Sequence, residues 1–165
     1  MRIGQGFDFH ALKPRLKLVL GGVIIDHDKG LEGHSDADVL THAIIDALLG
    51  AAGLGDIGMH FPDDDPSYKD ANSIDLLGKV CVIIRNHGWE ISNVDATVFA
   101  QEPKIAPHRQ TMEKNLASCM GVSETSVNVK ATTTEGLGFV GRREGIGSSA
   151  VAMLCTRASE TEARC

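Results

Sequence analysis

The order in which hydrophobic periodicity changes along the chain constrains the fold more than any other feature of this sequence. Apolar residues alternate as in β-strands near both ends, whereas the middle of the chain repeats them at helical spacing. The predicted order of elements is ββααβαββ. Because strands at both ends flank the helices, we predict an α+β fold in which helices pack on one face of a mixed β-sheet.

The predicted strands either alternate in hydrophobicity or form a short apolar run. The second of them is interrupted at Gly21 and Gly22, which indicates a turn or a bulge. We expect residues 29–34 to form a glycine-containing loop and residues 135–147 to form a glycine-rich turn. The predicted strands are 1–10, 16–25, 91–101, 126–132 and 145–155.

Three helices are predicted from apolar spacing and from residues that favour helix ends. Ser35 is the expected N-cap of the first helix, since Asp38 follows it three residues later, and Gly53 is its expected end. Pro107 can begin the third helix, and Gly121 is its expected C-terminal residue. The predicted helical segments are 35–52, 72–86 and 107–120, and an acidic loop with two prolines spans 56–69.

The length and the charge of the chain limit what it can be. A chain of 165 residues is long enough for one domain with its own core, which we place at residues 1–156, followed by a polar tail at residues 157–165. The formal net charge of −6 gives no general attraction for nucleic acid or for an anionic membrane. Any phosphate must therefore be held locally by metals, backbone N–H groups and a few cations.

The cysteines and the apolar runs bear on the compartment. None of the four cysteines forms a C-x-x-C pair, so we expect reduced thiols, with Cys81 and Cys119 in the core and Cys165 exposed in the tail. No stretch approaches the ~20 apolar residues of a membrane span, and residues 1–10 lack the apolar run of a signal peptide. We expect a cytoplasmic protein, or a plastid one if a plant-like transit peptide has been removed.

The most informative polar residues are Asp8, His10 and His42. Asp8 and His10 lie two apart on a predicted strand, so their side chains leave the same face of that strand. A carboxylate and two imidazoles suit zinc and leave its fourth position open, as in catalytic sites. Asp46, one helical turn after His42, is a candidate partner for the second ring nitrogen of His42. On spacing alone, packed or solvated histidines are the more frequent interpretation of such a triplet.

A second polar cluster follows the predicted strand 126–132. Hydroxyls and backbone N–H groups at this strand end can hold phosphate oxygens, and Glu135 can hold a hard cation such as Mg²⁺. In the acidic loop, Asp56 and Asp63 can face a sugar hydroxyl or a cation. The alternatives are a β-branched strand with a polar end and a solvated acidic turn. The candidate cations for a phosphate are Lys104 and Arg142.

Short motifs run through the chain in a fixed order. They include GFDFH at 6–10, HSDADV at 34–39, GDIG at 55–58, FPDDDP at 61–66, QEPK at 101–104 and NVKATTTE at 128–135. Together, over nearly the whole chain, they closely resemble the cyclodiphosphate synthase family of the non-mevalonate isoprenoid pathway. Gly136 and Arg143 depart from what is usual for that family near Glu135.

The resemblance implies an activity and its cofactors. It implies a phosphorus–oxygen lyase that cyclises 4-diphosphocytidyl-2-C-methyl-D-erythritol 2-phosphate to 2-C-methyl-D-erythritol 2,4-cyclodiphosphate and releases CMP. It implies Zn²⁺ on Asp8, His10 and His42, and a second divalent ion, Mg²⁺ or Mn²⁺, at Glu135. It also implies a single catalytic domain that assembles as a homotrimer, with active sites between neighbouring subunits.

The resemblance also implies roles for individual residues. His34 and Thr133 match positions that stabilise the transition state, Asp56, Gly58 and Asp63 match a methylerythritol pocket, and 100–106 matches a cytidine site. The implied substrate-binding residues are Asp8, His10, His34, Ser35, Asp56, Gly58, Phe61, Asp63, Ala100, Lys104, Ala106, Thr132, Thr133, Glu135, Phe139 and Arg142.

Two functions other than cyclisation also fit residues of this sequence. An Asp/His/His zinc site with an open position can activate water, so a zinc-dependent phosphoester or diphosphate hydrolase is the enzymatic alternative. The turn at 138–142 places Phe139 near Arg142, and in the family this region borders a threefold-axis cavity that resembles a site for isoprenoid diphosphates. A purely structural turn is the alternative for that segment.

Overall fold

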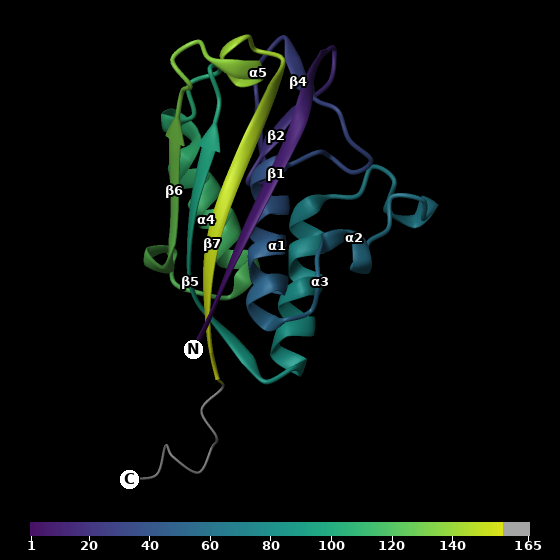
Figure 1. Ribbon diagram of the computed structural model, residues 1–165, viewed down its shortest axis with the longest axis vertical. Helices are drawn as coiled ribbons and strands as arrows, with labels where there is room; N and C mark the ends of the chain where they lie inside the picture. Colours follow the sequence, from purple (N-terminus) through teal and green to yellow (C-terminus); the bar gives the residue numbers. More distant parts are fainter. Residues whose placement is uncertain (157–165) are drawn as a thin grey trace.

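A five-stranded mixed sheet forms the frame of the molecule in this computed structural model, which describes residues 1–156 (Figure 1). The strand order is β4-β1-β7-β5-β6, with β5 and β6 parallel and the other neighbours antiparallel. The strands are β1 (Arg2–Pro14), β4 (Lys29–Leu31), β5 (Trp89–Phe99), β6 (Val127–Thr132) and β7 (Gly145–Thr156). A separate hairpin pairs β2 (Leu18–Leu20) with β3 (Val23–Ile25).

Three long helices cover one face of the sheet, which confirms the α+β prediction (Figure 1). Helix α1 packs on β1 and β7, α3 on α1 and β5, and α4 on β6 and α3. Their bounds are α1 (Val39–Ala52), α3 (Ser73–Asn86) and α4 (Arg109–Met120); the short elements are α2 (Ile57–His60), α5 (Gly138–Gly141) and the 3₁₀ turns η1 (Pro66–Tyr68), η2 (Ala106–His108) and η3 (Glu124–Ser126).

The structure corrects the predicted order of elements in four segments. Residues 16–25 form two strands, because Gly21 and Gly22 both have positive φ and make the turn of a hairpin. Residues 29–34, predicted as a loop, contain β4, which pairs Leu31 with Leu12 of β1. The acidic loop at 56–69 contains α2 and η1, and the turn at 135–147 contains α5. Elements of three or four residues are too short for a periodic signal.

The first helix begins later than predicted. Its N-cap is Asp38 rather than Ser35, and the Asp38 carboxylate accepts hydrogen bonds from Thr41 N at 3.0 Å and from Gly21 N at 2.9 Å. The hydrogen bond from Gly21 comes from the β2–β3 turn, which is distant in the sequence, so local sequence alone favours the wrong N-cap. The predicted helix ends are confirmed, since Gly53 and Gly121 both cap their helices in the left-handed conformation.

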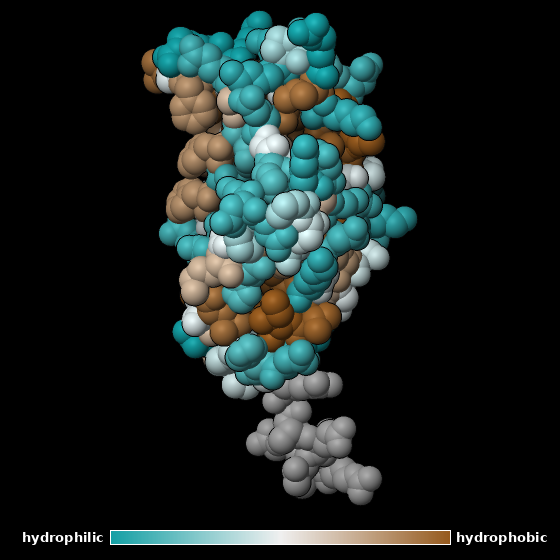
Figure 2. Space-filling model, turned by 90° about the vertical axis from the view of Figure 1, so that its right-hand side faces the viewer, coloured by the Kyte–Doolittle hydropathy of each residue, from teal (hydrophilic) through white to brown (hydrophobic). Residues whose placement is uncertain are grey.

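The other face of the sheet carries exposed apolar side chains. Ile3, Phe7, Phe9 and Val151 are 72%, 52%, 53% and 42% exposed. Figure 2 shows hydrophobic side chains along its left-hand edge, the side toward which this face points. An apolar strip of this kind, uncovered in one chain, is typical of a contact surface between proteins.

The cysteine predictions hold for the part of the chain that the structure describes. Cys81 is buried, Cys119 is partly buried and packs against the core, and these two and Cys155 are free thiols. Cys165 and the predicted tail lie outside the described residues. Among residues 1–156, no helix combines the length and the hydropathy needed to cross a lipid bilayer.

Candidate functional site

Two glycines allow the first helix to lie unusually close to the first strand. A Cβ atom on Gly6 would stand 2.1 Å from the Ala43 carbonyl oxygen, and one on Gly4 would stand 2.0 Å from the Ala47 carbonyl oxygen. Asp8 and His10 continue the same face of β1, so they point toward the first turn of α1. This close approach brings His42 to the two strand residues.

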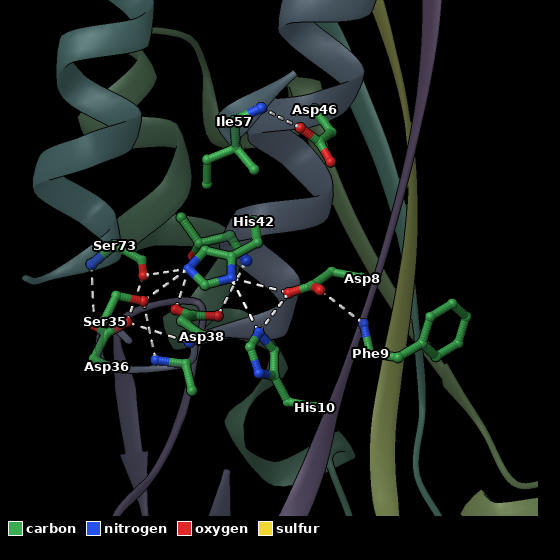
Figure 3. Close-up of polar contacts among 12 residues, drawn as sticks. Asp8, Phe9, His10, Ser35, Asp36, Asp38, His42, Asp46, Ile57 and Ser73 are labelled. Carbon is green, nitrogen blue, oxygen red and sulfur yellow. Dashed lines mark hydrogen bonds and ion pairs between the residues drawn. The ribbon is translucent and has the colours of Figure 1, made fainter. Parts of the chain in front are cut away.

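Asp8, His10 and His42 converge on a common centre, as the sequence predicted (Figure 3). Asp8 Oδ2 lies 2.9 Å from both His10 Nε2 and His42 Nδ1, and these two nitrogens are 3.4 Å apart. Ligands at about 2.0–2.1 Å from a tetrahedral zinc ion are separated by roughly 3.3 Å. The donor set and its spacing therefore fit zinc with small adjustments.

The outward nitrogens of both histidines have partners that favour a metal-binding tautomer. His10 Nδ1 lies 2.7 Å from the Glu32 carbonyl oxygen, to which it can only donate, so Nε2 is the ring nitrogen available to a metal. His42 Nε2 lies 2.9 Å from Ser73 Oγ and 3.1 Å from Ser35 Oγ. Such outer contacts orient metal-ligating histidines.

The predicted role of Asp46 as partner of His42 is wrong. The Asp46 carboxylate accepts a hydrogen bond from Ile57 N at 2.7 Å, at the start of α2 (Figure 3). Burial, followed by the nearby charges of Asp56 and Asp8, raises the pKa of Asp46. Asp46 therefore ties α2 to α1 instead of supporting His42.

Electrostatics couple the candidate ligands. Burial of the Asp8 carboxyl acts to raise its pKa, but hydrogen bonds and charges from His10 and His42 outweigh burial and hold it well below its ordinary value. Burial acts to lower the pKa of His10, but its contacts with Asp8 outweigh this and raise it. A site that concentrates negative charge on Asp8 beside two imidazoles is suited to a divalent cation.

The three candidate ligands open into a cavity of about 300 Å³. His34, Ser35, Gly58, Phe61 and Asp63, all predicted site residues, line it together with the ligands. Asp56 stands beside it as the N-cap of α2, where its carboxylate accepts from Met59 N at 3.0 Å. The structure thus gathers the predicted metal and sugar residues in one place.

The predicted cytidine residues gather around a second hollow, of about 200 Å³. Ala100, Lys104, Ala106, Thr132 and Thr133 line it. Within residues 1–156, Glu135, Phe139 and Arg142 follow β6 on the loop before β7, outside the lining of both cavities. Thr133 Oγ1 donates to Glu135 Oε1 at 2.6 Å, so the hollow and Glu135 are in direct contact.

One chain does not bring the two cavities together. Three residue pairs connect the two sites across the sheet. Phe9 of β1 pairs with Gly147 of β7, Gly147 pairs with Phe99 of β5, and Phe99 pairs with Thr132 of β6. These residues form one row across the sheet, and three strand spacings of about 4.8 Å separate its ends by roughly 14 Å. The metal residues and the predicted cytidine residues therefore stand at the same level on different strands.

Sequence reasoning missed several residues of the site. Glu32 contributes a backbone carbonyl and Ser73 a hydroxyl, and neither residue belongs to a recognisable motif. Tyr68 and Leu76, which line the main cavity, belong to η1 and α3. Ser73 follows the N-cap Asn72 of α3, and only the packing of α3 on α1 brings it to His42.

The chain is similar to known proteins along almost its full described length. The model of the YgbB family matches residues 1–155. A protein of Enterococcus faecalis named 2-C-methyl-D-erythritol 2,4-cyclodiphosphate synthase is 58% identical over 154 residues, which cover 93% of this chain and 98% of that protein. The protein of the same name from Moorella thermoacetica is 57% identical and covers 95% and 96% of the two chains.

Solved structures show the same fold. The bifunctional IspDF of Campylobacter jejuni matches with a TM-score of 0.91 and 46% identity over 94% of this chain, which spans only 42% of that larger protein. The IspF of Plasmodium falciparum in complex with CDP matches with a TM-score of 0.84 and 36% identity, covering 95% and 97% of the two chains. The extent of these matches, together with a candidate Asp/His/His metal site, shows that the chain belongs to the YgbB family, whose curated relatives are 2-C-methyl-D-erythritol 2,4-cyclodiphosphate synthases.

Proposed function

We propose that this protein converts 4-diphosphocytidyl-2-C-methyl-D-erythritol 2-phosphate into 2-C-methyl-D-erythritol 2,4-cyclodiphosphate and CMP, a step of the non-mevalonate route to isoprenoids. The observation that carries the proposal is the convergence of Asp8, His10 and His42 at the floor of one cavity. Membership of the YgbB family and the names of the relatives support the same reaction.

The reaction needs no strong protein base. The attacking group is the substrate's own 2-phosphate, which has a second pKa near ~6 and is largely dianionic at neutral pH. Its oxygen attacks the β-phosphorus in line, a P–O bond forms, and the bond to the CMP oxygen breaks as CMP leaves with the electron pair. The protein's task is to orient two anionic groups, which can lower a barrier by roughly 7–11 kcal/mol.

We assign the binding roles as follows. Asp8, His10 and His42 would hold Zn²⁺, which when bound supplies Lewis-acid polarisation of a phosphoryl oxygen. His34 and Thr133 would donate hydrogen bonds to phosphoryl oxygens and so stabilise the transition state. Asp56, Gly58, Phe61 and Asp63 would hold the methylerythritol, Ser35 a phosphate, and Ala100, Lys104, Ala106 and Thr132 the cytidyl group.

We assign the second divalent cation, Mg²⁺ or Mn²⁺, to Glu135. Its backbone has φ of 52°, in the left-handed region that residues with a Cβ rarely adopt, and Gly136 follows with φ of 80°. Backbone strain of this kind is common at ligand-binding turns. The carboxylate stands beside Thr133, within reach of a phosphate held at that hollow.

We infer that the active site is shared between subunits of a homotrimer. The metal residues and Thr133 are assigned to phosphoryl oxygens of one diphosphate, yet one chain holds its metal residues roughly 14 Å from the hollow that Thr133 lines. A neighbouring chain that packs on the uncovered sheet face would supply the missing half, and the exposed Phe7, Phe9 and Val151 support such packing. We place this assembly in the cytoplasm, or in a plastid if the source is plant-like.

A shared site is tested by mixing two inactive variants. His42→Ala removes a metal ligand and Thr133→Ala removes a cytidine-site residue, so each homotrimer should be inactive. After subunit exchange, mixed trimers should contain some sites that carry neither substitution, and CMP release should return. Recovery no greater than that of each variant alone would contradict the shared site.

The reaction itself is tested by product analysis in H₂¹⁸O. The proposal predicts CMP and a cyclic product without solvent oxygen, and a chelator should abolish CMP release. A linear product that carries ¹⁸O would instead support the zinc-dependent hydrolase.

The turn that carries Phe139 is a candidate binding site for a second kind of ligand in the trimer. Phe9 and Phe139 meet edge to face with ring centroids 5.8 Å apart, on the uncovered side of the sheet, and Arg142 stands three residues later. We infer an isoprenoid diphosphate site on the threefold axis, for which Arg142 would exchange its bidentate pairing with Glu144 for a phosphate. Titration with geranyl diphosphate should show binding that Arg142→Ala weakens; equal affinity would refute it.

A further inference from the structure

The second nitrogen of His42 faces two hydroxyl groups that differ in their surroundings. A metal on Nδ1 requires that the ring proton be on Nε2, which then donates to Ser73 Oγ at 2.9 Å or to Ser35 Oγ at 3.1 Å. Ser73 is fully buried, whereas Ser35 is partly exposed and lines the cavity. Ser35 also accepts a hydrogen bond from Ala37 N at 3.2 Å, so its oxygen is already shared.

The hydroxyl proton of Ser73 is committed to a carboxylate. Ser73 Oγ donates to Asp36 Oδ1 in a short hydrogen bond, and Ser73 N donates to Asp36 Oδ2 at 3.0 Å (Figure 3). Since its proton points to Asp36, Ser73 Oγ presents only lone pairs to His42. A hydroxyl in this state can accept the Nε2 proton but cannot donate one, so it favours a ring that carries a proton on Nε2, as a metal on Nδ1 requires.

Asp36 is itself held in place by backbone groups. Its N–H donates to the Ala71 carbonyl at 3.0 Å, and its Oδ1 accepts from Asp38 N at 3.2 Å. These contacts fix the carboxylate between the turn before α1 and the first turn of α3. The Asp36 carboxylate is therefore held in a fixed position, from which it can orient the Ser73 hydroxyl toward the His42 ring.

We propose that Asp36 and Ser73 are positioning residues that act through a carboxylate–hydroxyl–imidazole chain to fix the ring orientation and the tautomer of His42, and thereby set the affinity of the metal site. The inference rests on the proposed metal site and deepens it. A carboxylate usually contacts a metal-binding histidine directly. Here a serine lies between them, so the carboxylate charge reaches the ring only through a polarised hydroxyl.

The test measures zinc affinity and the exchange of the His42 Nε2 proton in protein without substrate. Competition with a chelator should show that Ser73→Ala binds zinc about 10–100-fold more weakly than the unchanged protein. Ser118→Ala is the matched control, because Ser118 is an exposed serine on α4, and it should leave the affinity unchanged. Asp36→Asn should also weaken binding, and the double variant should be little weaker than Ser73→Ala, since Asp36 acts through Ser73.

The Nε2 proton of His42 supplies a readout that a merely structural role would not move. With ¹⁵N-labelled histidine in the zinc-loaded protein, the His42 Nε2–H should exchange slowly with solvent, and it should exchange faster in Ser73→Ala or Asp36→Asn. If Ser73→Ala fails to fold, Asp36→Asn carries the same two measurements. Zinc affinity within twofold of the unchanged protein, or unaltered exchange of the Nε2 proton in both variants, would overturn the proposal. Failure of the unchanged protein to bind zinc would instead refute the metal site itself.

Discussion

A side chain at Gly6 should separate the first helix from the first strand. In Gly6→Ala, the added Cβ would stand 2.1 Å from the Ala43 carbonyl oxygen and 2.7 Å from Ala47 N, both backbone atoms that cannot rotate away. Ordinary contact begins at 3.4 Å, so the helix must retreat by about 1.3 Å, the difference between 3.4 and 2.1 Å. The retreat would also open space over the tightly packed alanines of α1.

The expected cost follows from the size of this displacement. Overpacking a core typically costs about 1–3 kcal/mol, and a clash with backbone belongs at the upper end of that range. For a domain of this size, a loss of about 3 kcal/mol lowers Tm by roughly 6–12 °C. Metal–ligand distances tolerate deviations of only about 0.2 Å, so the shift of His42 away from Asp8 should also weaken zinc binding at least tenfold.

Calorimetry of the metal-free protein and chelator competition measure the two effects. Gly50→Ala is the matched control on the same helix, because Gly50 is exposed and its nearest neighbour to an added Cβ is Gln5 O at 3.9 Å. It should stabilise the protein by about 0.5–1 kcal/mol, since alanine favours helices over glycine. Unchanged Tm and zinc affinity in Gly6→Ala would show that the close approach does not position His42.

Three further predictions concern the site and the core. His42→Ala should lower zinc affinity and CMP release by more than about 100-fold while leaving the circular dichroism unchanged; wild-type turnover in the metal-analysed variant would rule out its role. In metal-free protein, the lowered pKa of Asp8 stabilises the fold at pH values above 3.8, its ordinary pKa, and this stability is lost as the pH falls. The raised pKa of His10 stabilises the fold at pH values below 6.5, its ordinary pKa, and this stability is lost as the pH rises. The urea midpoint should therefore differ most from that of Asp8→Asn between these two pH values, and a difference that is flat with pH would contradict the pairing. Burial, followed by the nearby Cys119, raises the pKa of Cys81 to about 12, so iodoacetamide at pH 8 should modify Cys81 only in urea; modification in the native protein, seen by peptide mass spectrometry, would refute this burial.

Local pattern predicted those features that depend on local causes. The two-residue spacing of Asp8 and His10 was enough to place both on one face of β1, and Gly53 and Gly121 end their helices through their own left-handed backbone. The metal triad also needed His42 on the facing turn of α1, which the family motifs supplied. These predictions succeeded because strand parity and helix capping are properties of neighbouring residues.

The features that were missed depend on contacts between distant segments. Asp38 is the N-cap because Gly21 N and Gly22 N, at the β2–β3 turn, donate to its carboxylate at 2.9 and 2.8 Å. Asp46 and His42 lie on one helix face, which favours the wrong pairing, whereas the Asp46 carboxylate accepts from Ile57 N of α2. Ser73 reaches His42 only through the packing of two helices, which no local pattern specifies.

The central claim is that Asp8, His10 and His42 together hold one zinc ion. Zinc analysis with X-ray absorption spectroscopy of the purified, zinc-loaded protein tests it most directly. We predict one zinc ion per chain, bound by two imidazole nitrogens and at least one oxygen at about 2.0–2.1 Å, and we expect His42→Ala to lose it. A zinc ion with sulfur ligands, or loading that is unaffected by His42→Ala, would contradict it.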